Sequence, residues 1–315
     1  ARRRRPSGRR FPDVEGEGEE FHFVQLADTQ LGLADQFVPR DQRQGWAQEL
    51  AHARRAAAEI NRLRPAFAIV CGDLVDEFPS EERDSKADPD MRAAQVRDFQ
   101  AAMGLVDPDI PLLCICGNHD IGNRPNAITV RKFSEQFGDD YFSFRCHGVR
   151  CIVVNSQFWK DDSDAEDLRK AMDAWLDAEL DGPPAPTLVF SHIPPFVNDA
   201  GEKSEYFNIG LELRKRWLRR FAARGATGWF SGHYHRNAGG TFTDEDGRKL
   251  EVVVTAAVGA QLLDKPGGEP LGLSGIGGAG IGEDVSGLRV VRVSPGGRFS
   301  HRWRTFADLR AEVEE

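Results

Sequence analysis

Short apolar runs rich in β-branched and aromatic residues recur along the chain and predict buried β-strands. They cover residues 21–27, 66–70, 111–116, 149–154, 187–190 and 227–230. Between many of these runs, apolar residues repeat with helical spacing, and the helices predicted from them cover residues 44–63, 164–180 and 211–223. Strands that alternate with helices predict an α/β architecture.

The final third of the chain has a different pattern. Strand-like runs at 250–257, 287–293 and 298–304 follow one another without helices between them. This pattern predicts a mixed or antiparallel second sheet that packs on the first. We expect residues 21–315 to form a single domain, with a glycine-rich surface loop at 264–287. Residues 1–20 are rich in arginine and glutamate and are expected to form a disordered tail.

Composition narrows the class of protein. The net charge of −9 and the pI near 5.5 argue against a nucleic-acid-binding surface. No apolar run is long enough to span a membrane, and the arginine-rich start does not resemble a signal peptide. The five cysteines form no CxxC pair, which is typical of free thiols in a reducing compartment. We therefore expect a monomeric cytoplasmic protein, with the arginine run as a candidate nuclear signal.

Five predicted strands end in polar side chains that can bind metals or transfer protons. Any one of these residues could simply form a turn, but turn formation does not explain their gathering at the ends of so many strands. A mixed set of imidazole, carboxylate and amide groups is typical of sites that bind Mn, Fe, Zn or Mg ions, and not of thiolate sites. Two such ions about 3.5–4 Å apart can promote phosphoester hydrolysis. In chain order the residues are Asp28, Gln30, Asp73, Asp76, Asn118, His119, Asp120, His192, His233 and His235.

The order of these motifs resembles that of the calcineurin-like metallophosphoesterase superfamily. The matching motifs are Asp-x-Gln, Gly-Asp-x-x-Asp, Gly-Asn-His-Asp, a single histidine and Gly-His-x-His. Residues 117–123, 138–144, 155–158 and 230–241 extend the resemblance to a serine/threonine phosphatase group within that superfamily. The resemblance implies a two-sheet β-sandwich of mixed strands flanked by helices, arranged as four layers, αββα.

The resemblance also implies a role for each motif residue. One ion would be held by Asp28, Gln30, Asp73 and His235, and the other by Asp73, Asn118, His192 and His233. A metal-activated hydroxide would attack the phosphorus, and His119, oriented by Asp76, would protonate the leaving group. Asp120 is expected to make a hydrogen bond within its loop.

Two positions depart from the usual pattern. Most of the superfamily has histidine where this chain has Gln30, so the first ion should be harder or more weakly held. The second departure is Glu77, which occupies a position where related phosphatases carry a phosphate-binding arginine. Arg236 and Arg124 are candidates to supply that charge, and Asn123 and Tyr206 are further candidate substrate contacts.

The leading hypothesis is a phosphomonoesterase that acts on phosphoserine or phosphothreonine in a phosphorylated protein or on a small phosphoester. A phosphodiesterase or nucleotidase would use the same ligands, and a scaffold that has lost catalysis is a third alternative. The presence of His119 and of seven predicted ligands argues against the scaffold.

Overall fold

A computed structural model describes residues 18–264, 279–281 and 285–309. Its first β-sheet has five strands in the order β13-β12-β1-β2-β3. Strands β1, β2 and β3 are parallel, whereas β12 pairs with β1 in the antiparallel direction. The bounds are β1 (Phe21–Leu26), β2 (Phe67–Cys71), β3 (Leu112–Ile115), β12 (Gly287–Val293) and β13 (Phe299–Thr305).

The second sheet has six strands in the order β4-β5-β6-β7-β9-β8. Strands β5, β6, β7 and β9 are parallel, and the edge strands β4 and β8 are antiparallel to their neighbours. Their bounds are β4 (Phe142–Cys146), β5 (Val149–Val153), β6 (Thr187–Phe190), β7 (Ala226–Ser231), β8 (Ala238–Thr243) and β9 (Lys249–Val254).

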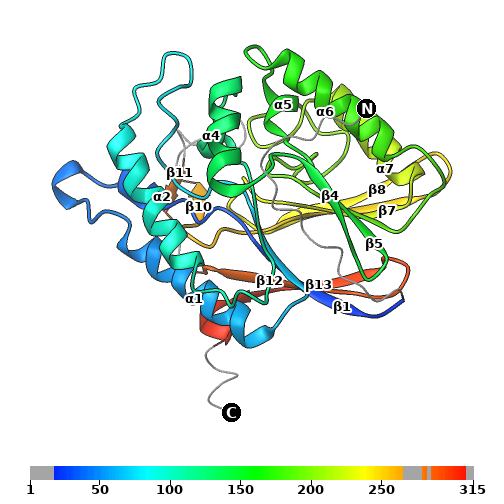
Figure 1. Cartoon of the computed structure of the whole chain (residues 1–315), viewed down its shortest axis with the longest axis horizontal. Coiled ribbons are helices and arrows are strands. Elements are labelled where there is room, and N and C mark those ends of the chain that lie inside the picture. The colour runs from blue at the N-terminus through cyan, green and yellow to red at the C-terminus, as the bar shows by residue number, and fades with distance from the viewer. Residues whose placement is uncertain (1–17, 265–278, 282–284, 310–315) are drawn as a thin grey trace.

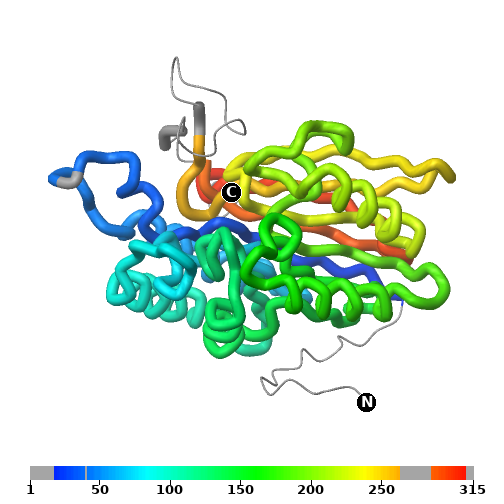
Figure 2. Tube along the Cα trace, turned by 90° about the horizontal axis from the view of Figure 1, so that it is seen from above, coloured from blue at the N-terminus to red at the C-terminus, as the bar shows by residue number. Residues whose placement is uncertain are grey.

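Helices cover the outer faces of the two sheets, so the architecture is the predicted sandwich of mixed sheets (Figure 1). Helix α1 packs on α2 and on β12, and α7 packs on β7 and β9. In Figure 2, the segment that contains η1 and η2 projects at one edge of the molecule. The helices are η1 (Leu33–Phe37), η2 (Arg40–Gln42), α1 (Ala47–Leu63), α2 (Pro89–Met103), α3 (Asn118–Ile121), α4 (Ala127–Phe137), α5 (Gln157–Lys160), α6 (Glu166–Glu179) and α7 (Leu211–Ala223). Within the described ranges, none of them is long and apolar enough to cross a membrane.

Aromatic rings fill the space between the two sheets. Phe23 of β1 stacks on Phe67 of β2, with ring centroids 4.8 Å apart. From the second sheet, Phe190 and Phe230 meet Phe23 edge-on, with centroids 5.5 and 5.3 Å away. Edge-to-face contacts are favourable for aromatic rings, and burial of these large apolar groups stabilises the packing of one sheet on the other. Because the core fixes the relative position of the sheets, it also fixes the positions of the loops at their ends.

The prediction for the final third of the chain is wrong in its topology. The three strands do not form a sheet of their own, because β9 joins the second sheet and β12 and β13 join the first. Strand β12 completes the first sheet through its antiparallel register with β1, in which Phe23 lies opposite Val291. Local sequence cannot reveal this arrangement, because it depends on pairing between opposite ends of the chain.

The glycine-rich segment is also less irregular than predicted where the structure describes it. Strands β10 (Leu262–Asp264) and β11 (Ala279–Ile281) pair in the antiparallel direction and form a small separate sheet. Residues 265–278 and 282–284 lie outside the described residues, as does most of the predicted N-terminal tail.

Candidate metal centre

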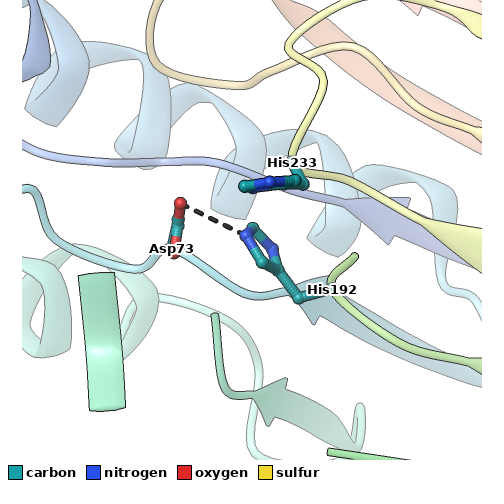
Figure 3. A group of neighbouring side chains, drawn as sticks. All are labelled: Asp73, His192 and His233. Carbon is teal, nitrogen blue, oxygen red and sulfur yellow. Dashed lines mark ion pairs between the residues drawn. The ribbon is translucent and has the colours of Figure 1, made fainter. Parts of the chain in front are cut away.

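The predicted site residues follow five strands, three in the first sheet and two in the second. Asp28 and Gln30 follow β1, Asp73 follows β2, and Asn118 follows β3. His192 follows β6, and His233 and His235 follow β7. The carboxyl ends of these strands meet at one edge of the sandwich, as expected for ligand sites in parallel sheets. Figure 3 shows the side chains of Asp73, His192 and His233 close together, with the ion pair between Asp73 and His192 marked.

Two groups of potential metal ligands form there, and they share one carboxylate. Asp28, Asp73 and His235 place ligand atoms within 4.8 Å of one another, and so do Asp73, His192 and His233. All of these side chains are buried. We call the residues Asp28, Gln30 and His235 the first group and Asn118, His192 and His233 the second group, with Asp73 common to both.

The two amide side chains extend these groups. Asn118 Oδ1 lies 3.1 Å from His192 Nε2, which in turn lies 3.3 Å from Asp73 Oδ2. Gln30 donates from Nε2 to Asp76 Oδ1 at 3.2 Å, whereas its Oε1 atom is buried without a hydrogen-bond partner among the described residues. A buried carbonyl oxygen without a partner is costly, and a bound cation would remove that cost. The donor atoms therefore fit a divalent ion.

Main-chain carbonyls orient the three imidazoles. His192 Nδ1 donates to Cys71 O at 2.8 Å, and His235 Nδ1 donates to Ala260 O at 2.7 Å. In both rings Nε2 then faces the carboxylates, 3.5 Å from Asp28 Oδ1 in the case of His235. His233 is held from its other nitrogen, because Nε2 lies 3.3 Å from Tyr206 O. Such contacts fix the tautomer of a histidine and are typical of metal-ligating imidazoles.

The backbone is unusual at the same positions. Of the eight non-glycine residues with positive φ in the described chain, five are predicted ligands. Positive φ is uncommon for residues with a Cβ atom, and such conformations gather at functional sites. The five residues are Asp28, Gln30, Asp73, His233 and His235, with φ between 34° and 69°.

Glycines in the motifs give the carboxylates room. A Cβ atom on Gly117 would lie 2.1 Å from Asp73 Oδ1, and one on Gly232 would lie 2.6 Å from Asp28 Oδ2. Both distances are shorter than any ordinary contact, so a side chain at either position would displace a carboxylate. The glycines of Gly-Asn-His-Asp and Gly-His-x-His are thus explained by close approach of the backbone to the site.

Electrostatics within the site favour bound cations. Burial raises the pKa of the Asp28 carboxyl well above its ordinary value. Burial also opposes ionisation of Asp73, but the nearby imidazoles of His192 and His119 outweigh it and hold the pKa of Asp73 below its usual range. Burial lowers the pKa of His192, but the Asp73 carboxylate outweighs this and raises it to about 9. Burial lowers the pKa of His235 to about 4, which keeps this imidazole neutral.

The predicted proton donor, His119, lies beside both groups. Its main-chain N–H donates to Asp73 Oδ1 at 2.9 Å, and its Nε2 accepts from Gln30 Nε2 at 3.0 Å. Asp76 is adjacent as predicted, but the shorter contact comes from its main chain. His119 Nδ1 donates to the Asp76 carbonyl oxygen at 2.5 Å, whereas the nearest carboxylate oxygen of Asp76 is 3.6 Å away. The carboxylate of Asp76 instead accepts from Gln30 and, at 2.7 Å, from Gln36.

Asp120 makes the loop hydrogen bonds that the sequence predicted. Its carboxylate accepts from the main-chain N–H of Leu74 at 3.1 Å and from that of Gly117 at 2.8 Å. Asp120 therefore joins the loop after β2 to the loop after β3.

Arg92 and Phe78 also contact this site, although no motif in the sequence marks them. The Arg92 guanidinium of α2 donates to the carbonyl oxygens of His119 at 2.8 Å and Asp120 at 2.7 Å, and also to that of Glu77. The Phe78 ring lies over His119, with centroids 4.1 Å apart. Arg92 is far from both loops in sequence, and an arginine in a polar helix is usually a solvated side chain, so no local signal could have identified it.

The four candidate substrate residues differ in what they contact. Tyr206 is half-buried against the second group, with its hydroxyl 3.3 Å from Asn118 Nδ2. Arg236 donates to Leu262 O at 2.6 Å and lies over the Tyr234 ring, whereas Arg124 donates to the Arg83 carbonyl oxygen at 3.0 Å. Asn123 is exposed just beyond α3. Of these four residues, Tyr206 has a direct contact with a predicted ligand.

Comparison with known proteins identifies the family. The family described as "Calcineurin-like phosphoesterase" matches residues 21–237. The serine/threonine-protein phosphatase CPPED1 of Danio rerio is 38% identical over 92% of this chain and 86% of the relative. The Bos taurus protein of the same name is 39% identical over 92% of this chain and 85% of the relative.

A solved structure agrees in fold. The purple acid phosphatase PPD1 from yellow lupin (Lupinus luteus) seeds superposes with a TM-score of 0.60, over 95% of this chain and 53% of that chain, at 12% identity. At that identity the likeness shows a common fold alone, but the sequence matches extend over most of the chain. The chain therefore belongs to the calcineurin-like phosphoesterase family.

Proposed function

We propose that this protein is a phosphomonoesterase that removes phosphate from phosphoserine and phosphothreonine side chains of proteins with the help of two divalent ions. The observation that carries the proposal is the pair of buried ligand groups that share Asp73. The relatives named as serine/threonine-protein phosphatases, which match over most of their length, support the choice of substrate.

The seven predicted ligands divide between two ions in this proposal. The first ion would be held by Asp28, Gln30 and His235, the second by Asn118, His192 and His233, and Asp73 would bridge them. The two bound ions, which could be Mn, Fe, Zn or Mg, would supply a nucleophile at neutral pH and neutralise charge on the phosphoryl oxygens. The neutral oxygen of Gln30 in place of an imidazole favours a harder or more weakly held first ion.

His119 would donate the proton that the leaving alkoxide requires. In the neutral ring Nδ1 keeps its proton on the Asp76 carbonyl oxygen and Nε2 accepts from Gln30, so the proton for the leaving group would be the one that Nε2 takes up when the ring is protonated. Imidazole suits this step because its ordinary pKa lies near working pH. Asp76 would act as a positioning residue through its main-chain carbonyl. Arg92 would support the same segment by donating to the carbonyl oxygens of His119 and Asp120.

Substrate contacts complete the proposal at Tyr206, Arg236 and Asn123. A phosphoprotein or small phosphoester is the proposed partner, without nucleic acid or membrane, and the protein is proposed to act as a monomer. The five free cysteines fit a reducing cytoplasmic compartment, and the N-terminal arginine run would also suit nuclear import.

A substrate comparison tests the function. Purified protein with added Mn²⁺ is assayed on p-nitrophenyl phosphate, bis-p-nitrophenyl phosphate, and phosphoserine and phosphothreonine peptides. The proposal expects release of phosphate from the monoester and from the peptides. Turnover of the diester alone would make the protein a phosphodiesterase. An absence of turnover with any of the four metals would indicate a non-catalytic scaffold.

A further inference from the structure

Tyr206 contacts two of the three residues of the second group. Asn118 Nδ2 donates to the Tyr206 hydroxyl at 3.3 Å, and His233 Nε2 donates to the Tyr206 carbonyl oxygen at 3.3 Å. The Tyr206 ring also lies beside the His233 ring, with centroids 5.0 Å apart. One residue thus touches both an amide and an imidazole of the same group, through different atoms.

The contact with the hydroxyl holds one end of the Asn118 amide away from the centre of the second group. An amide side chain presents an oxygen on one side and an NH₂ on the other, and only the oxygen can bind a cation. With Nδ2 directed to Tyr206, Oδ1 lies 3.1 Å from His192 Nε2 and faces the second group. Without the hydroxyl, the amide would lose the contact that holds its Nδ2 end away from the second group.

The contact with the carbonyl decides the tautomer of His233. Because Nε2 carries the proton that is donated to Tyr206 O, the lone pair of the neutral ring is on Nδ1. Burial lowers the pKa of His233 well below its ordinary value, which agrees with a neutral ring. Nδ1 is then the atom available to the group formed with Asp73 and His192, whose side chains Figure 3 shows beside His233.

The segment that carries Tyr206 is itself held rigidly from outside the site. Lys160 Nζ, at the end of α5, donates to the carbonyl oxygens on both sides of Tyr206, those of Glu205 and Asn208, the latter at 3.1 Å. Arg214 of α7 is fully buried and donates to the carbonyl oxygens of Glu202 at 2.8 Å and Ile209 at 2.9 Å. We call residues 197–209 the Tyr206 loop. Two cationic side chains thus fix its main chain, which limits the movement of Tyr206.

The first group is oriented by other parts of the chain. His235 is held by Ala260 O, Asp28 accepts from the main-chain N–H of His233, and Gln30 is tied to Asp76. We propose that Tyr206 is a positioning residue for the second ion alone, and that the Tyr206 loop makes the two ions unequal in affinity. This inference rests on the proposed dinuclear site.

Titration with Mn²⁺ tests the inference without an activity assay. Metal-free wild type and Tyr206→Phe are titrated by calorimetry, and electron paramagnetic resonance distinguishes an isolated ion from a coupled pair. Loss of an outer contact to a metal ligand costs about 10- to 100-fold in affinity. Tyr206→Phe should therefore weaken one of the two binding steps by that factor, and isolated Mn²⁺ should accumulate where wild type shows the coupled pair.

Three further variants make the result specific. Gln30→Ala should weaken the binding step that Tyr206→Phe leaves unchanged. A variant that combines Gln30→Ala with Tyr206→Phe should therefore bind both ions weakly. Lys160→Met, which releases the loop without touching a ligand, should weaken the same step as Tyr206→Phe. Tyr141→Phe is the matched control, because it removes a hydroxyl from a ring that packs on Trp175 of α6, and it should bind Mn²⁺ as wild type does.

Unchanged affinity at both steps in Tyr206→Phe would overturn the inference, as would an equal loss at both steps. Normal metal binding with a raised KM would also overturn it and leave Tyr206 as a substrate contact alone. If wild type itself never forms the coupled pair, the dinuclear proposal fails together with the inference. That outcome is recognised before any variant is examined.

Discussion

The two ligand groups share Asp73 but are built differently. In the second group every side chain has an outer contact that aims a ligand atom at the centre: Cys71 O for His192, and Tyr206 for Asn118 and His233. In the first group, Gln30 leaves a buried oxygen without a partner among the described residues. Every ligand side chain of the second group is thus organised by its surroundings, whereas in the first group one polar atom, Gln30 Oε1, would be satisfied by an ion.

The difference also separates their chemical roles. The nitrogen of Gln30 contacts both Asp76 and His119, so the first group is joined to the proposed proton donor. The second group is joined instead to the Tyr206 loop, on the side where substrate contacts are proposed. In the proposed site, glutamine in place of the usual histidine would therefore affect the ion nearest the proton donor and leave the other group intact.

Removal of the shared carboxylate should have the largest effect. Asp73→Asn replaces a bridging carboxylate by a neutral amide, so neither group can hold its ion and activity should fall to background. Elemental analysis of the purified variant measures the loss. Circular dichroism should show a folded chain, and retention of both ions would contradict the assignment of Asp73 to both groups.

Loss of the proton donor should be less severe and should spare the metal. His119→Ala is expected to lower kcat by roughly 10²- to 10⁴-fold, because it removes general acid catalysis, while metal content stays at the wild-type level. His147→Ala, in the turn between β4 and β5, is the matched control and should keep the wild-type kcat and the wild-type metal content. A normal rate in His119→Ala would assign the proton transfer to another group.

A change at Gln30 probes the difference between the groups directly. Gln30→His supplies an imidazole nitrogen, so the first ion should bind more tightly, on the order of tenfold. Competition with a chelator measures the affinity of each step. The second step should not change, and an unaltered first step would show that Gln30 does not limit the affinity of its group.

The smallest expected effect is a pH dependence caused by the support of the Tyr206 loop. Burial, with Arg214 nearby, lowers the pKa of Lys160 from 10.5 to about 8. Between these two values the unfolded chain binds this proton and the folded chain does not, so this residue makes stability rise with pH across the window. Below a pH of about 8, the folded state bears the full cost of burying the charged Lys160 ammonium.

Comparison with Lys160→Met isolates that contribution from the other groups that titrate in the same range. Urea unfolding of the metal-free proteins should show a free energy of unfolding that rises less with pH in the variant than in wild type, between pH 8 and pH 10.5. Parallel curves would indicate that the Lys160 ammonium is solvated rather than buried.

Much of the candidate site could be predicted because its signals are local. A polar residue directly after a buried strand, with a glycine beside it, marks a position where the backbone approaches a charged group, as Gly117 does at Asp73. Three of the predicted ligands, Asp73, Asn118 and His233, have such a glycine, and with the polar residues after the other strands they were enough to predict a metal site at this sheet edge. The resemblance to the family then divided them between two ions, and the family itself is confirmed by the comparisons.

The supporting residues could not be predicted in the same way. Arg92 and Phe78 have no motif: Arg92 reaches His119 from a helix, and Phe78, although only two residues beyond Asp76, contacts His119 because the loop after β2 packs on the segment after β3. Lys160 acts at one remove, through the main chain of the Tyr206 loop. The separation of the last strands between two sheets was missed for the same reason, since pairing of β12 with β1 is a contact between the two ends of the chain.

The sequence by itself determined the kinds of ligand, their order and the strands that carry them, because these follow from local periodicity and from the close approach that glycine permits. The tertiary structure decided which atom of each side chain faces the centre. The orientation of Asn118, the tautomers of His192 and His233, and the main-chain contact of Asp76 with His119 all depend on partners from other segments. A residue type specifies the donor and acceptor atoms, but only packing specifies their directions.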